Sequence, residues 1–176
     1  MARPWRQLMS DLKDPIGDKG REAVCLFRES ASSDHSAIRE ILGEANLSFH
    51  SPNRASNKSG SPAVPVIGST FICLCERAGE VVAVLQWRHL GEEAEILDIA
   101  VPTRHRRNGY ARFLLKNFLS LAQERGTREV FLEVRESNAA ALALYREFGF
   151  EASGRRPRYY REPTEAALLL HLKITG

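Results

Sequence analysis

Apolar positions along the chain alternate between two periods: every second residue, as in half-buried strands, and every third or fourth residue, as on one face of a helix. Strand-like runs occupy residues 24–28, 70–76, 81–87, 95–101, 130–134, 150–153 and 166–174. Helix-like runs occupy residues 34–43, 108–124 and 138–148. The order is a strand, a helix, three strands, a helix, a strand, a helix and two strands. It predicts an α/β (mixed α+β) fold in which helices flank a mixed sheet.

Glycines and a capping residue mark the ends of the helical runs. Gly126 and Gly149 follow the two later helices, where a C-terminal cap is commonly a glycine. Ser137 or Asn138 can cap the start of the last helix with a side-chain oxygen. The arginine- and tyrosine-rich residues 155–160 are interpreted as the connection between the last two strands.

Length and composition indicate one domain preceded by an arm. At 176 residues, with 43% hydrophobic and 27% charged residues, the chain suits a single packed core. Residues 1–20 are polar and show little periodicity, so we expect an N-terminal arm followed by one domain over residues 21–176. Residues 46–69 are rich in Ser, Asn and Pro and predict a long loop, whose role stays open.

Composition also narrows the compartment and the partners. The net charge of +3 is too small to indicate a direct nucleic-acid partner, although arginines cluster at residues 104–107 and 155–161. The first residues lack the apolar run of a signal peptide, and no segment has the ~20 apolar residues of a membrane span. Cys25, Cys73 and Cys75 form neither a redox nor a zinc pattern and are interpreted as buried thiols. We therefore expect a cytoplasmic protein without a membrane partner.

The most informative segment joins the strand that ends near Val101 to the following helix. Residues 101–112 read Val-Pro-Thr-Arg-His-Arg-Arg-Asn-Gly-Tyr-Ala-Arg, an arginine-rich turn with one glycine. Because backbone N–H groups at a helix start are unpaired and the helix dipole is positive there, arginines beside them make a seat for a pyrophosphate. The segment is neither a Walker A loop nor a Gly-x-Gly-x-x-Gly dinucleotide motif. On this pattern alone, solvated arginines at a helix N-terminus are an equal alternative.

Further motifs in a fixed order favour the phosphate site. Arg106, Gly109 and Ala111 fit Arg-x-x-Gly-x-Ala between a strand and a helix, and residues 131–150 add Leu-Glu-Val-Arg, Ser-Asn-Ala-Ala and Ala-Leu-Tyr. Over residues 93–160 the chain resembles the GNAT superfamily of N-acetyltransferases, and within it the ribosomal-protein alanine N-acetyltransferases. The resemblance implies a mostly antiparallel, splayed mixed sheet. It also implies an N-acetyltransferase that moves an acetyl group from acetyl-CoA to a primary amine without a metal.

The resemblance assigns roles to individual residues. Glu133 would be the general base, acting directly or through a water, and Tyr145 would be the general acid. Tyr159 and Tyr160 would line the acceptor groove, in a segment similar to that of the alanine acetyltransferases. Acetyl-CoA would be held by a strand end that pairs with the pantetheine arm, by the amides of the turn and by a helix cap. These cofactor-binding residues are Ile99, Ala100, Val101, Arg106, Arg107, Asn108, Gly109, Tyr110, Ala111, Arg112 and Asn138.

These residue types suit acetyl transfer, in which a neutral amine attacks a thioester and a thiolate leaves. An α-amine has a pKa of ~7.7–8.0, so a single carboxylate suffices to deprotonate it. Each residue also has a structural alternative. Glu133 could face solvent or pair with Arg128 or Arg135, and the last two tyrosines could lie on a surface hairpin. Tyr145 could be a core residue with a satisfied hydroxyl. Asp98 stands behind Glu133 as a candidate second carboxylate.

The acceptor is the least determined part of the function. The likeness to the alanine acetyltransferases weakens at residues 46–69 and after Tyr160, where the acceptor would sit. Three functions stay open: acetylation of a protein N-terminal α-amine, acetylation of a small-molecule amine, and a catalytically idle acyl-CoA-binding module that regulates a partner. The presence of Glu133, Tyr145 and Asn138 together argues against the third. The oligomeric state is also open, with a homodimer as one possibility.

Overall fold

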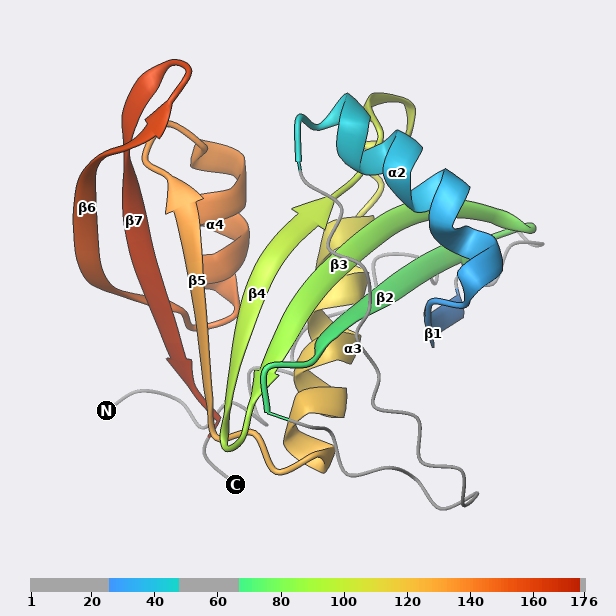
Figure 1. The fold of residues 1–176 in the computed structure, drawn as a ribbon, viewed down its shortest axis with the longest axis horizontal. Coiled ribbons are helices and arrows are strands. Elements are labelled where there is room, and N and C mark those ends of the chain that lie inside the picture. The colour runs from blue at the N-terminus through green and yellow to red at the C-terminus, as the bar shows by residue number, and fades with distance from the viewer. Residues whose placement is uncertain (1–25, 48–66, 175–176) are drawn as a thin grey trace.

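The computed structural model describes residues 26–47 and 67–174, in which a seven-stranded sheet carries helices on both faces (Figure 1). The strands lie in the order β1-β2-β3-β4-β5-β7-β6. They are β1 Leu26–Glu29, β2 Thr70–Arg77, β3 Glu80–Leu90, β4 Glu93–Ala100, β5 Glu129–Arg135, β6 Glu151–Arg161 and β7 Thr164–Lys173. The helices are α2 His35–Glu44, α3 Tyr110–Glu124 and α4 Ala139–Glu147, with short 3₁₀ turns η1 Ser32–Asp34 and η2 Thr103–His105. The predicted N-terminal arm and most of the predicted loop 46–69 lie outside the described residues.

The sheet splits between β4 and β5. These two strands run parallel, whereas every other neighbouring pair runs antiparallel. Their pairing ends at Ile96↔Leu132, although β4 continues to Ala100 and β5 to Arg135. Figure 1 shows the two strands diverging beyond that point. The later half of β4 therefore has a backbone edge that β5 does not pair with.

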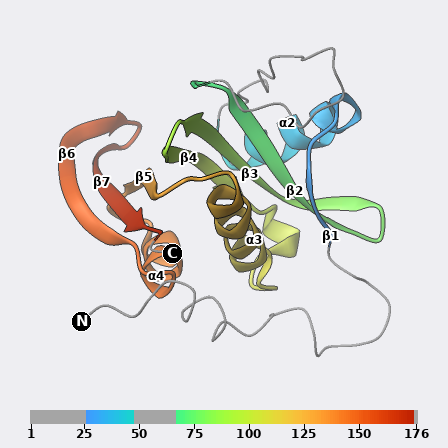
Figure 2. The same cartoon turned by 90° about the horizontal axis from the view of Figure 1, so that it is seen from below.

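Helices α3 and α4 cover one face of the sheet and α2 covers the other (Figure 2). The main core lies between the sheet and α3 and α4, and includes Leu114, Phe118 and Leu132. A smaller core lies under α2 and includes Ile38 and Val84. Because successive strand residues point to opposite faces, the sheet can supply both cores with apolar side chains.

A β-bulge changes the facing of β4 just before the split. Gln86 pairs with Asp98, and the next residue of β3 pairs with Ile96, so Leu97 is an extra residue on β4. Ile96 packs in the main core before the bulge, whereas Ala100 packs in the α2 core after it. Bulges commonly re-aim side chains in this way. By strand alternation, Asp98 shares the α2 face with Ala100.

The predicted fold class is confirmed, and each predicted strand and helix within the described residues is present with shifted ends. One interpretation is wrong. Residues 155–160 do not connect the last two strands but lie inside β6. The ladder to β7 is nevertheless interrupted between Arg156 and Tyr160, in a stretch that begins with Pro157. Proline has no backbone N–H to donate to a ladder, so it is tolerated only at an edge or a bulge, and β6 is an edge strand.

The interpretation of all three cysteines as thiols is wrong for Cys75, which is disulfide-bonded. Cys73 is a buried thiol, and Cys25 lies outside the described residues. The spacing of the cysteines did not reveal the pairing of β1 with β2, in which Phe27 is opposite Cys75. Within residues 26–47 and 67–174, every helix is too short or too polar to cross a bilayer.

Phe118 anchors α3 to the sheet, because it is 0% exposed and its ring lies 5.2 Å from the ring of Trp87. Phe118→Ala removes this apolar surface and leaves a cavity, so we expect the free energy of unfolding to fall by ~3–5 kcal/mol in urea denaturation. Ser120→Ala, at a half-buried position of the same helix, is the control and should change that value by less than ~0.5 kcal/mol. Equal losses in both variants would contradict the central place of Phe118.

Candidate active site

The arginine-rich turn leads from β4 into the first turn of α3. Gly109 has φ 80°, a left-handed conformation that glycine adopts without steric cost, and Arg107 has φ 65°. The Phe113 N–H donates to the Gly109 carbonyl at 2.9 Å. The amides of Tyr110 to Arg112 therefore precede this helical hydrogen bond and lie at the positive end of the helix dipole. This is the arrangement that the sequence predicted for binding a pyrophosphate.

Acidic side chains from other elements brace the turn. The Thr103 N–H donates to Glu44 at the end of α2 (2.6 Å), and both Arg104 and His105 bond Glu80 at 3.0 Å. These hydrogen bonds hold the pKa of each glutamate below its ordinary value, led by the Thr103 amide at Glu44 and by His105 at Glu80. Both glutamates therefore stay ionised near neutral pH, and they tie the turn to α2 and to the β2–β3 hairpin.

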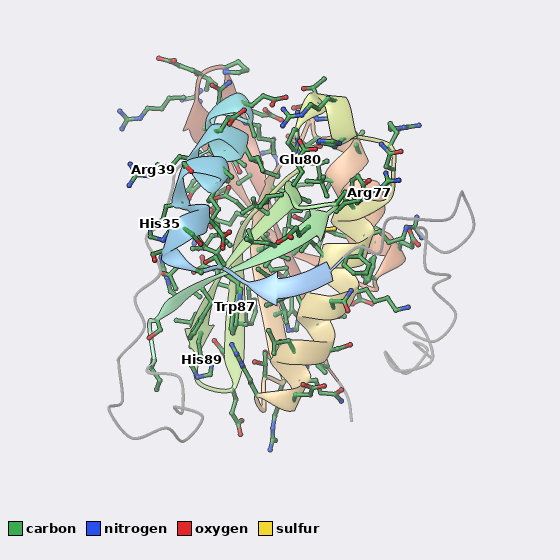
Figure 3. The ribbon with its side chains drawn as sticks, turned by 90° about the vertical axis from the view of Figure 1, so that its right-hand side faces the viewer. His35, Arg39, Arg77, Glu80, Trp87 and His89 are labelled. Atoms are coloured by element: carbon green, nitrogen blue, oxygen red, sulfur yellow. The ribbon has the colours of Figure 1, made fainter. Side chains whose placement is uncertain are left out.

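Arginine side chains complete the bracing. Arg77 donates to the Tyr110 hydroxyl at 2.9 Å, and Figure 3 shows Arg77 and Glu80 at one end of the sheet, with Trp87 and His89 at the other. Arg106 Nε donates to the Val101 carbonyl at 3.1 Å. Arg112 pairs with Glu147 of α4. Two of the predicted cofactor-binding arginines, Arg106 and Arg112, therefore use their side chains to hold the turn between β4, α3 and α4.

Asn138 is the N-cap of α4, as the sequence predicted. Its Oδ1 accepts a hydrogen bond from the Ala141 N–H at 3.1 Å. Asn108, the other predicted cofactor-binding asparagine, donates its Nδ2 to the carbonyls of His105 and Arg106, each at 3.1 Å. Both amide side chains therefore stabilise local backbone.

Glu133 lies on β5, on the face turned away from α3, because its neighbours Leu132 and Val134 pack in the main core. Its Oε1 pairs with Arg156 Nη1 of β6 at 2.5 Å, and the Tyr159 hydroxyl donates to the same carboxylate. Its side chain is 23% exposed. The alternatives of a solvent-facing Glu133 or of pairs with Arg128 or Arg135 are wrong, since Arg128 pairs with Glu92 and Arg135 with Glu165.

Tyr145 lies on α4 and is 7% exposed in the main core, with its ring 5.5 Å from that of Phe150. Burial raises the pKa of the Tyr145 hydroxyl well above its ordinary value, and the negative charge of Asp98 and the hydroxyl of Tyr160 add to the effect. The hydroxyl therefore keeps its proton at neutral pH and can act as a donor. A tyrosine packed as a core residue and a proton-donating tyrosine are compatible here.

Tyr159 and Tyr160 lie in the bulged part of β6. Tyr159 is 47% exposed, and the two rings meet edge to face at 5.1 Å. The Arg135 guanidinium sits 4.0 Å above the Tyr160 ring, a cation–π contact. Burial and the charge of Glu133 raise the pKa of Tyr160. The β6–β7 hairpin therefore brings both tyrosines to Glu133, so they are not merely surface residues.

Asp98 is the carboxylate that the sequence set in second place. Gln86 Nε2 donates to its Oδ2 at 3.0 Å, and Gln86 is 0% exposed. Burial raises the pKa of Asp98 to about 6, although the Gln86 hydrogen bond acts in the opposite direction. The sequence analysis missed both Gln86 and Arg156. The signal for Gln86 was a polar side chain inside the apolar run 81–87, whereas nothing in the sequence linked Arg156 to Glu133.

No group of three or more His, Cys, Asp or Glu side chains suited to a metal ion occurs among residues 26–47 and 67–174. The residues predicted to be catalytic or to bind acetyl-CoA or the acceptor lie instead along the β4–β5 split. The turn follows β4, Glu133 is on β5, Tyr145 is on α4 behind it, and the two tyrosines are on β6. The arrangement combines a helix N-terminus suited to a pyrophosphate with a carboxylate and a protonated phenol.

The chain belongs to the acetyltransferase (GNAT) family, whose model matches residues 37–150. It is 38% identical over 86 residues to the [ribosomal protein bS18]-alanine N-acetyltransferase of Escherichia coli K12, a match over 48% of this chain and 58% of that relative. It is 48% identical over 69 residues to the N-alpha-acetyltransferase RimI of Mycobacterium tuberculosis, over 39% and 42% of the two chains. The match thus spans less than two thirds of the length of these curated relatives.

Solved structures agree with this assignment. The crystal structure of the ribosomal-protein-S18-alanine N-acetyltransferase from Escherichia coli superposes with a TM-score of 0.72 at 26% identity, covering 87% of this chain and 96% of that one. The acetyltransferase yncA from Salmonella typhimurium, solved with acetyl-CoA, has a TM-score of 0.66 at 16% identity, covering 87% and 95%, which is a likeness of fold. The resemblance to the GNAT superfamily and to the alanine N-acetyltransferases is confirmed.

The cap at Asn138 can be tested apart from any ligand. Asn138→Ala removes the oxygen that bonds the Ala141 amide, so we expect the free energy of unfolding to fall by ~0.5–2 kcal/mol in urea denaturation. Asn138→Asp keeps an oxygen acceptor and should retain most of the stability. If Asn138→Ala were as stable as the original protein, the hydrogen bond to Ala141 would contribute nothing as a cap.

Proposed function

We propose that this protein transfers the acetyl group of acetyl-CoA to a primary amine, and that the amine is the free α-amine of a protein N-terminus. The observation that carries the proposal is the split between β4 and β5, with the family's arginine–glycine turn at one end. A carboxylate, Glu133, lies beside the split, and a buried phenol, Tyr145, lies on the helix behind it. Membership of the GNAT family and the names of its relatives support the same chemistry.

Acetyl-CoA fits the edge of β4 and the turn that follows. Backbone N–H and C=O groups of Ile99, Ala100 and Val101 would pair with the amides of the pantetheine arm as an added strand. The β4–β5 ladder has ended before these residues, and the Val101 carbonyl already accepts from Arg106. The amides of residues 107–112 would hold the pyrophosphate at the start of α3. Asn138 at the start of α4 is proposed as a further hydrogen-bonding contact.

The two side chains divide the proton transfers. Glu133, directly or through a water, would take a proton from the acceptor ammonium, whose ordinary pKa is ~7.7–8.0, so that a neutral amine attacks the thioester. Arg156 and Tyr159 hold the Glu133 carboxylate in place until the amine arrives. Tyr145 would give its proton to the leaving sulfur, a role that its raised pKa supports.

An N-terminal peptide is the acceptor that the surroundings of Glu133 support best. Tyr159 is half exposed and bonded to Glu133, so it offers an aromatic surface to the residues that follow an amino terminus. Tyr160 lies beneath it, held by Arg135. The curated relatives from Escherichia coli and Mycobacterium tuberculosis are named for alanine or α-amine acetylation, which supports the same acceptor class.

The acceptor class can be tested with two peptides and acetyl-CoA, read by mass spectrometry. One peptide begins with a free alanine amine, and the other is N-blocked and carries an internal lysine. We expect acetylation of the free-amine peptide alone. Acetylation of the lysine alone would contradict the proposed acceptor. Acetylation of neither, with acetyl-CoA binding confirmed by calorimetry, would replace it with a small-molecule amine or a regulatory module.

Removal of the proposed acid or base should lower turnover without weakening acetyl-CoA binding. We expect Glu133→Gln and Tyr145→Phe each to lower kcat on the free-amine peptide by ~10²-fold or more, with the Kd for acetyl-CoA unchanged within about twofold. Glu129→Gln, on the same strand and paired with His171 at 3.3 Å, is the matched control and should keep full activity. Full activity in the first two variants would remove them from the mechanism.

The pyrophosphate seat depends on the conformation and small size of Gly109. Gly109→Val strains a left-handed position and puts a branched side chain where the phosphates approach, so we expect the Kd for acetyl-CoA to rise at least about tenfold. Gly126→Val carries the same backbone strain at the other end of α3, with no atom within 4 Å of an added Cβ. That control should bind acetyl-CoA normally in calorimetry. Equal affinity of the two variants would place the pyrophosphate elsewhere.

A further inference from the structure

Asp98 is held at the point where β4 leaves β5. The ladder between these strands ends at Ile96↔Leu132, two residues before Asp98. On the other side of β4, Gln86 is the register partner of Asp98 and donates Nε2 to its Oδ2 at 3.0 Å. Because Gln86 is 0% exposed, its amide is fixed by packing and fixes the carboxylate in turn. Asp98 is therefore an oriented acid at the head of the split, next to the residues proposed to pair with acetyl-CoA.

The charge of Asp98 reaches two phenols on other elements. It raises the pKa of Tyr145 on α4, where burial is the larger cause, and it also raises the pKa of Tyr160 on β6. The charge of Glu133 on β5 acts on Tyr160 as well, and Arg135 acts on it in the opposite direction. Asp98 and Glu133 both belong to the face of the sheet turned away from α3. Two carboxylates and two phenols thus surround the split from β4, β5, α4 and β6.

The proton balance of the proposed reaction calls for a second acceptor. An ammonium R–NH₃⁺ and acetyl-CoA give an amide, a thiol and one proton in solvent. The C–N bond forms, the C–S bond breaks, and the nitrogen loses two protons. Glu133 accounts for the first proton, which leaves before attack and passes to solvent. Tyr145 gives its own proton to the sulfur and must regain one, while the second proton is still on the nitrogen.

We propose that Asp98 takes this second proton from the nitrogen as the C–N bond forms and returns it to the oxygen of Tyr145. The assignment rests on the acetyl transfer proposed above. Every proton is then accounted for: one from nitrogen through Glu133 to solvent, one from Tyr145 to sulfur, and one from nitrogen through Asp98 back to Tyr145. The protein returns to its starting state without a metal or any further reactant.

The environment of Asp98 suits a transient proton carrier. Burial sets its pKa at about 6, so the carboxylate is ionised at neutral pH and yet takes up a proton more readily than an ordinary aspartate. Its negative charge keeps the Tyr145 hydroxyl protonated before the reaction. Below pH 6 Asp98 is protonated and cannot accept the second proton, so turnover should fall on the acid side with a midpoint near pH 6.

Asp98→Asn tests the relay, because an asparagine keeps an oxygen for Gln86 but cannot carry the proton. On an amine that the original protein acetylates, we expect kcat to fall ~10-fold or more, with the KM for acetyl-CoA within about twofold. The acid limb near pH 6 should disappear. Glu93→Gln removes an exposed carboxylate at the other end of β4 and should keep both the rate and the limb. A kcat for Asp98→Asn within about twofold of this control would overturn the relay.

A double-mutant cycle separates a relay from a merely structural role. Because Asp98 and Tyr145 would act in one chain, Asp98→Asn combined with Tyr145→Phe should be no slower than Tyr145→Phe alone, within about threefold. Fully multiplicative losses would overturn the proposal. If Asp98→Asn does not fold, Asp98→Glu replaces it, and this variant should retain the acid limb and more activity than any neutral variant.

Failure of the proposed function would be visible separately, as a lack of acetyl transfer by the original protein to any amine. A measurement without turnover then decides on the relay. In a ¹³C NMR titration of aspartate carboxyl groups, one resonance, Asp98, should have a midpoint near pH 6 that moves in Tyr145→Phe. No resonance near that midpoint, or one that Tyr145→Phe leaves unchanged, would overturn the contact on which the relay depends.

Discussion

The end of one hydrogen-bond ladder organises this molecule. The parallel pairing of β4 and β5 stops at Ile96↔Leu132, and both strands continue without each other. Backbone N–H and C=O groups at such an edge need partners, so a bound ligand with its own amides can take the place of a strand. The bulge at Leu97 re-aims β4 at the same point. The arginine-rich turn and Glu133 are then fixed on the two sides of one split.

Charge is distributed along the split in a consistent way. At the turn, Glu44 and Glu80 neutralise part of the arginine charge and fix the backbone, which leaves the helix N-terminus as the directed positive feature. Further along, the ionisable groups are carboxylates and phenols, held by Arg156 and Gln86. The first region suits a phosphorylated ligand, and the second suits removal of protons from an amine. The proposed acetyl transfer needs both in one molecule.

Local patterns predicted most of the fold, because they depend on neighbours in the sequence. Alternating apolar residues gave the strands, and Asn138 and Gly109 marked helix starts through the conformations that these residues favour. The contacts that shape the site were not predictable in the same way. The Arg156–Glu133 pair joins two strands that are not sheet neighbours, and the Gln86–Asp98 bond depends on a bulge. Residues 155–160 looked like a loop because their strand is an exposed, bulged edge.

The central claim is that the later half of β4 and the turn after it hold acetyl-CoA as though it were an added strand and a phosphate ligand. Amide hydrogen exchange with and without coenzyme A tests this claim directly. The account predicts slower exchange on binding at residues 99–101 and 107–112, with little change at β1 and β2, which lie at the far side of the sheet. Binding without added protection in those two segments would contradict it.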